Sequence, residues 1–134
     1  MADLTTLIRP LYGRSDREAG VQALLEACDP EIEIWPGGLW LDDSSVCRGR
    51  AEVEEFFARL GDAFEDVTFV ADRFEERGEQ VAVEVSLNVR GRLSGIADSR
   101  SLGHLWRFRD GRVVEIRAFP VADDAFAALT EQPS

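Results

Sequence analysis

The chain has 134 residues, of which 45% are hydrophobic, so it can bury a core as a single domain over residues 1–134. Its formal net charge of −11 repels phosphate backbones and anionic lipids, which argues against nucleic-acid and membrane binding. No apolar run is long enough to cross a bilayer, and the start of the chain lacks the pattern of a secretory signal, so a cytoplasmic location is expected.

The first part of the chain predicts two helices and a strand. Residues 4–12 carry apolar side chains at helical spacing, and Pro10 either kinks this helix or marks where it begins. Ser15 and Glu18 form a capping-box pattern, which opens a second helix that ends at the following Asp-Pro pair. Residues 31–36 alternate apolar and polar side chains, as a strand does.

A loop at residues 37–45 and a helix from Arg50 to Phe64 follow. In the loop, Trp40 is either a lid or a packing residue, and Asp42 and Asp43 are either solvated or able to swing over a pocket mouth. The helix has the most regular apolar stripe of the chain, so we expect it to cover a sheet.

Three further strands complete the predicted sheet, and a short helix around residues 123–129 ends the chain. The strands are residues 67–75, residues 80–90 and a long hairpin over residues 102–119 that turns at Asp110-Gly111. Alternation places six hairpin side chains on one apolar face: Leu102, His104, Trp106, Phe108, Ile116 and Ala118. His104, the only histidine in the chain, is where we expect chemistry.

The sequence predicts no metal site and no cofactor. Cys28 and Cys47 stand apart, without a CxxC pattern or a neighbouring histidine, and are expected to be reduced and at least partly buried. A single histidine and the absence of carboxylates clustered at ligand spacing argue against bound zinc or iron.

The order of elements resembles the SnoaL-like branch of the nuclear transport factor 2 and ketosteroid isomerase superfamily. Four segments carry the resemblance, at residues 29–35, 47–57, 90–95 and 104–112. It implies an α+β fold, in which a cone-shaped, curled antiparallel sheet packs against N-terminal helices as a cystatin-like α+β roll. Members of this superfamily have different functions, so the residues of the site must decide the function.

The resemblance also implies roles for two residues. In the steroid isomerases of this superfamily a first-strand carboxylate abstracts a proton, while a tyrosine and a neutral acid stabilise the enolate. In this chain His104 takes the position of the neutral acid, and Tyr12 falls near that of the tyrosine. Ile34 or Trp35 stands where the carboxylate would be, so that mechanism does not transfer whole.

We therefore expect a small apolar molecule as the partner and cofactor-free acid–base catalysis on a polyketide-like or isoprenoid-like ring, with His104 and Tyr12 as catalytic residues. Such an enzyme would be an isomerase, a cyclase-type lyase or a hydrolase. The alternative is a ligand-binding or dimerisation module without turnover, which the missing first-strand carboxylate favours. For His104 alone, the alternative is a core histidine that a neighbour such as Tyr12 satisfies.

Nine apolar side chains are predicted to line the pocket, unless they simply fill the cone. They are Trp35, Trp40, Phe56, Phe57, Leu60, Val85, Leu87, Trp106 and Ile116. Leu105 and Phe119 lie among charges on the opposite sheet face, which predicts a homodimer through that face.

Overall fold

The computed structural model describes residues 4–13, 17–36 and 46–130. Its helical elements are α1 (Leu4–Ile8), the 3-10 turn η1 (Arg9–Leu11), α2 (Arg17–Ala27), α3 (Gly49–Ala63) and α4 (Ala122–Thr130). Its strands are β1 (Cys28–Trp35), β2 (Cys47–Arg48), β3 (Phe64–Arg77), β4 (Gln80–Gly91), β5 (Ala97–Arg109) and β6 (Arg112–Phe119).

The strands form one curled sheet with the order β2-β1-β6-β5-β4-β3. Neighbours along β3, β4, β5 and β6 are antiparallel, because short turns join them. β1 pairs with β6 in parallel, with Ile34 opposite Ile116. The fold is therefore the predicted curled α+β fold, except that the sheet is mixed rather than wholly antiparallel. The helices and strands between β1 and β6 bring the chain back to the start of the sheet, so that β6 runs in the same direction as β1.

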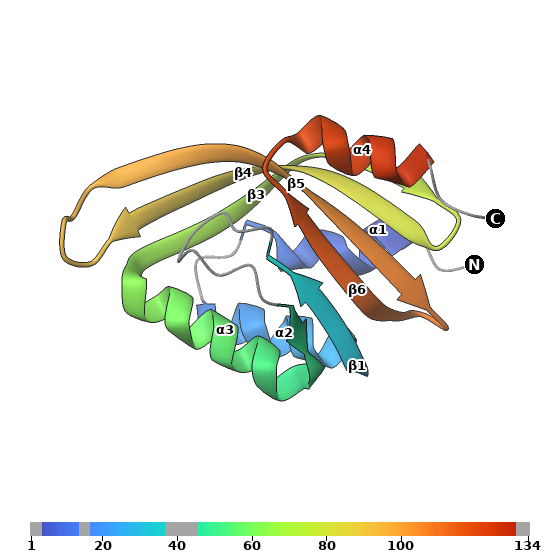
Figure 1. The fold of residues 1–134 in the computed structure, drawn as a ribbon, viewed down its shortest axis with the longest axis horizontal. Coiled ribbons are helices and arrows are strands. Elements are labelled where there is room, and N and C mark those ends of the chain that lie inside the picture. The colour runs from blue at the N-terminus through green and yellow to red at the C-terminus, as the bar shows by residue number, and fades with distance from the viewer. Residues whose placement is uncertain (1–3, 14–16, 37–45, 131–134) are drawn as a thin grey trace.

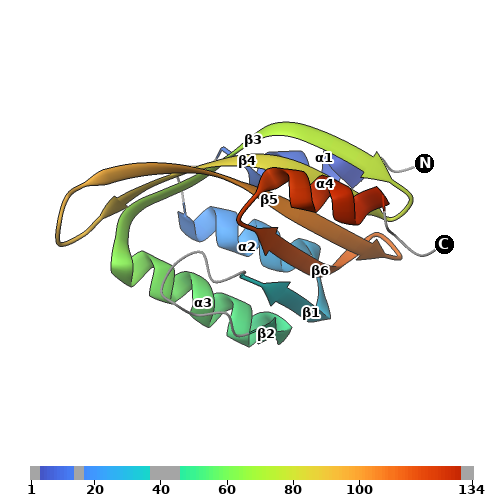
Figure 2. The same ribbon diagram turned by 45° about the horizontal axis from the view of Figure 1, so that its top comes forward.

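Helices cover both faces of the sheet. Figure 1 shows α2 and α3 on one side of the sheet and α4 on the other, and Figure 2 shows the same layers after a turn. The main core lies on the side of α2 and α3, where buried Phe56 and Leu60 of α3 pack with Leu102 and Trp106 of β5. The stripe predicted for residues 50–64 therefore covers the sheet as expected.

The chain turn after α1 positions Tyr12. Pro10 lies in η1, so the α-helix ends at Ile8 and a tighter turn follows. The backbone N–H of Tyr12 donates to the Arg9 carbonyl at 3.2 Å, and that of Gly13 donates to the Phe69 carbonyl of β3 at 2.6 Å. These two bonds hold the Tyr12 backbone between η1 and the sheet.

The turn between β5 and β6 has the predicted conformation. Asp110 has a φ of 53° and Gly111 a φ of 79°, as a two-residue hairpin turn of this type requires. The turn pairs Arg109 with Arg112 and Phe108 with Val113, and a register shift between Arg107 and Phe108 then pairs Trp106 with Ile116 and His104 with Ala118. The predicted apolar face of the hairpin is thereby preserved in the fold.

The C-terminal helix α4 packs on the outer sheet face. Leu105 is 6% exposed because it packs with Ala82 and Leu129, and half-buried Phe119 borders the same cluster. The expectation that Leu105 and Phe119 present a free face for a second copy is therefore wrong, since α4 of the same chain covers them. The homodimer itself stays a prediction.

Close packing of α4 depends on Gly103 in β5. A Cβ atom at this position would lie 2.8 Å from the Ala125 Cβ and 2.9 Å from the Ala122 Cα. Only a residue without a side chain lets the helix approach the strand this closely. Gly103 and the two alanines together form the contact between α4 and β5.

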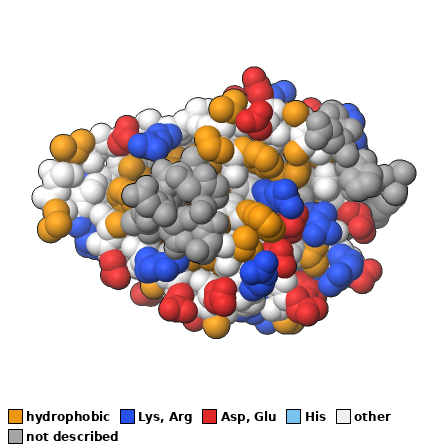
Figure 3. Space-filling view, viewed as in Figure 1, with side chains coloured by type: hydrophobic (Ala, Val, Ile, Leu, Met, Phe, Trp, Pro, Cys, Tyr) orange, Lys and Arg blue, Asp and Glu red, His pale blue; other side chains and the backbone are white. Residues whose placement is uncertain are grey.

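The surface carries both signs of charge. Figure 3 shows arginine and acidic side chains interspersed on one face, with hydrophobic side chains between them. Leu93 and Ile96, in the turn between β4 and β5, are the most exposed large hydrophobic residues of the described chain. No helix in the described ranges has the length and hydropathy required to cross a membrane.

Candidate functional site

A cavity of about 150 Å³ lies between the helices and the concave face of the sheet. It is partly open to solvent, and no described residue that lines it carries a charged side chain. Its lining is Leu11, Tyr12, Gly20, Val21, Leu24, Ile34, Pro36, Phe56, Phe57, Leu60, Val67, Phe69, Leu102, His104, Trp106, Ile116 and Ala118.

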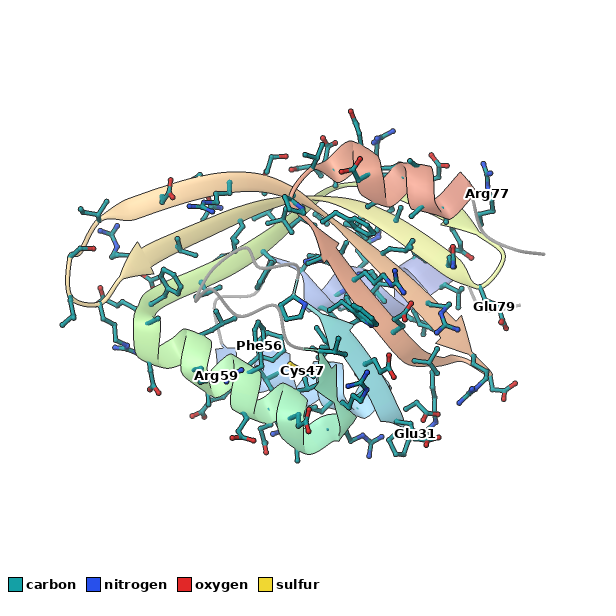
Figure 4. All side chains as sticks on the ribbon, in the orientation of Figure 1. Glu31, Cys47, Phe56, Arg59, Arg77 and Glu79 are labelled. Carbon is teal, nitrogen blue, oxygen red and sulfur yellow. The ribbon has the colours of Figure 1, made fainter. Side chains whose placement is uncertain are left out.

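Periodicity explains how these residues meet. On β5, every second residue faces the cavity, so Leu102, His104 and Trp106 lie along one line of the sheet. On α3, Phe56 and Leu60 are one turn apart and face the same way. Figure 4 shows Phe56 on the side of α3 that faces the sheet.

Three polar side chains form a hydrogen-bonded relay in the cavity wall. The indole N–H of Trp106 donates to the Tyr12 hydroxyl oxygen at 2.8 Å. The Tyr12 hydroxyl lies 2.7 Å from Nδ1 of His104. The hydroxyl of one tyrosine thus connects η1 to two residues of β5.

The direction of the second bond follows from donor and acceptor capacity. The indole nitrogen of Trp106 can only donate, so Nδ1 of His104 is the one acceptor that these two partners offer to the Tyr12 O–H, and we assign the O–H as its donor. A neutral imidazole has one protonated nitrogen, so the proton of His104 resides on Nε2. This tautomer is assigned from the hydrogen-bond network. Among the described residues, Nε2 has no hydrogen-bond partner.

Burial keeps both groups of the relay neutral. Burial lowers the pKa of His104 to about 4, since a charged imidazolium is poorly solvated there. Burial also raises the pKa of Tyr12 far above its usual value, and the hydrogen bond from Trp106 opposes this only in part. At neutral pH the cavity therefore presents a neutral imidazole whose Nε2–H is a donor.

Five of the predicted pocket residues line this cavity, together with Tyr12 and His104. They are Phe56, Phe57, Leu60, Trp106 and Ile116. The predicted contact between His104 and Tyr12 is present, while their catalytic role stays a prediction. Trp40, Asp42 and Asp43 lie outside the described residues.

Trp35, Val85 and Leu87 are not part of the cavity lining. Val85 and Leu87 are fully buried in the core around it. Trp35 lies on the opposite face of β1 from Ile34, because successive strand residues alternate, and the guanidinium of Arg117 lies 4.7 Å from its ring centre. The prediction that Trp35 faces the interior is therefore wrong.

Sequence reasoning missed the contributions of α2 and β3 to the cavity. Val21 and Leu24 of α2 line the cavity, whereas the second helix was predicted without any pocket residue. Phe69 of β3 lies with its ring centre 5.6 Å from that of His104. The donor role of Trp106 had no signal in the sequence, because it depends on where the indole nitrogen points.

A second hollow of about 260 Å³ lies near the turn between β4 and β5. It is partly open to solvent, and exposed Ser94, Ile96, Asp98 and Arg100 line it together with buried Leu87. It offers fewer features of a catalytic site than the cavity at His104.

The cysteines offer no activated thiol. Cys28 and Cys47 are buried and not in a disulfide. Burial raises the pKa of the Cys28 thiol to about 12, so the thiol stays protonated at neutral pH. The described residues contain no group of three or more His, Cys, Asp or Glu that could hold a metal ion.

Comparisons with known proteins agree with this architecture. Residues 16–116 match the SnoaL-like domain family. An NTF2-like protein from Burkholderia thailandensis E264 is 24% identical, with a TM-score of 0.78 over 99% of this chain and 100% of that one. A candidate SnoaL-like polyketide cyclase from Jannaschia sp. CCS1 is 17% identical, with a TM-score of 0.75 over 97% of this chain and 93% of that one.

TerC, crystallised with polyporic acid, is 23% identical, with a TM-score of 0.69 over 87% of this chain and 89% of that one. None of the curated proteins compared with the chain matches it significantly. The family match covers most of the chain, and the solved structures share its curled sheet and helices. The chain therefore belongs to the SnoaL-like domain family and has the NTF2-like fold.

Proposed function

We propose that this domain binds a small apolar molecule that contains a ring and a carbonyl group, and catalyses its cofactor-free isomerisation or cyclisation. The observation that carries this proposal is the Trp106–Tyr12–His104 relay, which fixes His104 as a neutral hydrogen-bond donor in an apolar cavity. Such cavities bind ligands through apolar surface and orient them through a few polar groups.

In the proposed reaction, His104 stabilises negative charge on the carbonyl oxygen. When a proton leaves the carbon next to the carbonyl, the electron pair moves to oxygen, and Nε2–H donates to the enolate that forms. A solution base takes the proton, and the enolate regains a proton from solvent at the same or a conjugated carbon. Among the described lining residues none carries a carboxylate, so no residue is assigned as the base.

Tyr12 acts in this proposal as a positioning residue. Its O–H donates a hydrogen bond to Nδ1 of His104. This bond keeps the imidazole proton on Nε2 and fixes the orientation of the imidazole ring. Trp106 orients the Tyr12 hydroxyl in turn. Relatives of this fold support small-molecule binding, since TerC was crystallised with polyporic acid and another relative is named a candidate polyketide cyclase.

Deuterium exchange tests the proposal without knowledge of the natural substrate. Cyclic and aromatic ketones are incubated with the protein in D₂O, and NMR follows loss of the proton next to the carbonyl. The wild type should accelerate exchange, and His104→Phe, which has no N–H donor, should lose at least about tenfold of that acceleration because one oxyanion donor is gone. Val85→Ala, in the core outside the cavity, is the matched control.

The outcomes separate catalysis from binding. Ketone binding that depends on His104 without any exchange would identify a binding module and refute the proposed catalysis. Exchange that is unchanged in His104→Phe would refute the role of the relay.

A further inference from the structure

The volume of the cavity limits the size of its ligand. Pockets for drug-sized molecules occupy roughly 300–1,000 Å³. The cavity at His104 has about 150 Å³, comparable to an engineered apolar cavity in another protein that holds one benzene molecule. A second fused ring does not fit within this volume and would have to displace a wall residue or project through the open side into solvent.

The lining also limits the charge of the ligand. No arginine, aspartate or glutamate is among the described lining residues, so an ionised ligand would find no counter-charge there. Burying an unpaired charge is far more costly than burying a neutral polar group. The cavity therefore selects against carboxylates and ammonium groups.

The relay leaves a single donor for the ligand. Trp106 uses its only N–H on Tyr12, and Tyr12 uses its O–H on His104. Nε2–H of His104 is the one polar hydrogen of these three side chains that remains. One acceptor on the ligand satisfies it.

Aromatic walls favour a ring. Phe56 and Phe57 of α3 meet edge to face, with ring centres 5.4 Å apart, and Phe69 of β3 also lines the cavity. Edge and face contacts with such side chains stabilise a flat ring beyond simple area burial.

We infer that the cavity selects an uncharged molecule with a single six-membered ring and one carbonyl or equivalent acceptor, rather than a fused polycycle. This inference rests on the proposed function, because it uses His104 as the hydrogen-bond donor. It adds the substrate class, and it assigns Phe57 as the residue that sets the size limit, since Phe57 is half-buried and lines the cavity.

The inference is tested with four small molecules, whose binding is measured by calorimetry or NMR titration. Acetophenone is the reference, and each of the other three differs from it in one feature. Acetophenone has one ring and a carbonyl, ethylbenzene lacks the carbonyl, 2-acetylnaphthalene adds a fused ring, and benzoate carries a charge. We expect acetophenone to bind the wild type with a Kd on the order of 0.1–1 mM, as its size allows. Ethylbenzene should bind roughly three- to tenfold more weakly, because it lacks the acceptor. 2-Acetylnaphthalene and benzoate should show no binding in this range.

Two variants sharpen the test. Phe57→Ala should admit 2-acetylnaphthalene, because it removes a ring from the wall. Val85→Ala should leave the preference for acetophenone unchanged, because Val85 lies in the core outside the lining.

The results distinguish the two proposals. If the wild type binds 2-acetylnaphthalene at least as tightly as acetophenone, and His104→Phe weakens both, the size inference is overturned while the proposed function stands. If benzoate binds as well as acetophenone, the charge inference is overturned. If neither ketone binds, or if His104→Phe binds both as the wild type does, the inference and the proposed function fail together.

Discussion

Tyr12 and His104 are 92 positions apart in the sequence, and the Tyr12 hydroxyl lies 2.7 Å from Nδ1 of His104. The same hydroxyl accepts a hydrogen bond from Trp106, two residues further along β5. One side chain from the start of the chain thus satisfies two buried polar groups near its end. The polar wall of the cavity exists only when these distant segments are docked.

Replacing Tyr12 with phenylalanine should lower the free energy of unfolding by about 1–3 kcal/mol. The change removes one hydroxyl and leaves both the Trp106 N–H and Nδ1 of His104 without their partner. Urea denaturation of the wild type and Tyr12→Phe measures the loss.

A double-mutant cycle provides the control for Tyr12. Trp106→Phe removes the indole donor, so adding Tyr12→Phe to it should cost less than Tyr12→Phe alone. Strictly additive losses would show that the two side chains do not interact in solution.

Stability should fall as the pH drops from about 6.5 to about 4. His104 titrates at about 4 when folded and at 6.5 when exposed, so in this window the unfolded chain binds more protons. The stability that His104 contributes is present above pH 6.5 and is lost as the pH falls. Between pH 7 and pH 5 the loss is at most about 2 kcal/mol, because the half-buried ring keeps some exposed surface.

His104→Gln is the control for this pH dependence, because the chain has no other histidine. Acidic side chains titrate mainly below pH 5, so the comparison is made between pH 5 and pH 6.5. Denaturant midpoints in this range should change less with pH in His104→Gln than in the wild type. Equal slopes would contradict the lowered pKa.

The imidazole of His104 should be protonated on Nε2 at neutral pH. Nitrogen-15 NMR distinguishes the two ring nitrogens, and Nδ1 should give the signal of an unprotonated nitrogen. In Tyr12→Phe the ring should become a mixture of tautomers, since the donor to Nδ1 is gone. A wild-type signal from protonated Nδ1 would reverse the direction of the relay.

Gly103→Ala should destabilise the fold by about 1–3 kcal/mol, because the new methyl group meets backbone atoms of α4 at 2.9 Å and 3.1 Å. Gly91→Ala is the matched control, since its methyl group meets only the exposed Ser94 side chain, whose hydroxyl can rotate at the cost of one exposed hydrogen bond from the Ile96 N–H. Thermal and urea denaturation should separate the two variants. Equal losses would argue against close packing of α4 on β5.

The parts of the fold that depend on neighbours in sequence could be predicted. The conformation of the Asp110-Gly111 turn was predicted from its two residues, and Leu102, His104 and Trp106 of β5 share one face as strand alternation requires. The positions of Ile116 and Ala118 opposite them depend in addition on the register shift next to Phe108. Burial of Phe56 and Leu60 followed from their helical spacing. These features rest on local geometry, which the sequence expresses directly.

The features that depend on distant segments could not be predicted from the pattern. Leu105 alternates with charged residues as an exposed position would, yet α4 covers it. Trp35 is apolar enough for the interior, but the pairing of β1 places it against Arg117. The two-residue strand β2 is too short to give any periodic signal. Each of these depends on how elements dock rather than on their own composition.

The parallel pairing of β1 with β6 has a consequence for how the protein is made. Ile34 of β1 pairs with Ile116 of β6, so β1, the strand that is synthesised first, cannot form this pairing until β6, the last strand, has been synthesised. The hairpins of β3 to β6 form from neighbouring segments, whereas closing the loop between β1 and β6 carries a larger entropic cost. On the ribosome the cavity can close only after almost the whole chain has emerged. Until then, the edge of β1 that pairs with β6 is unpaired and can hydrogen-bond to other chains.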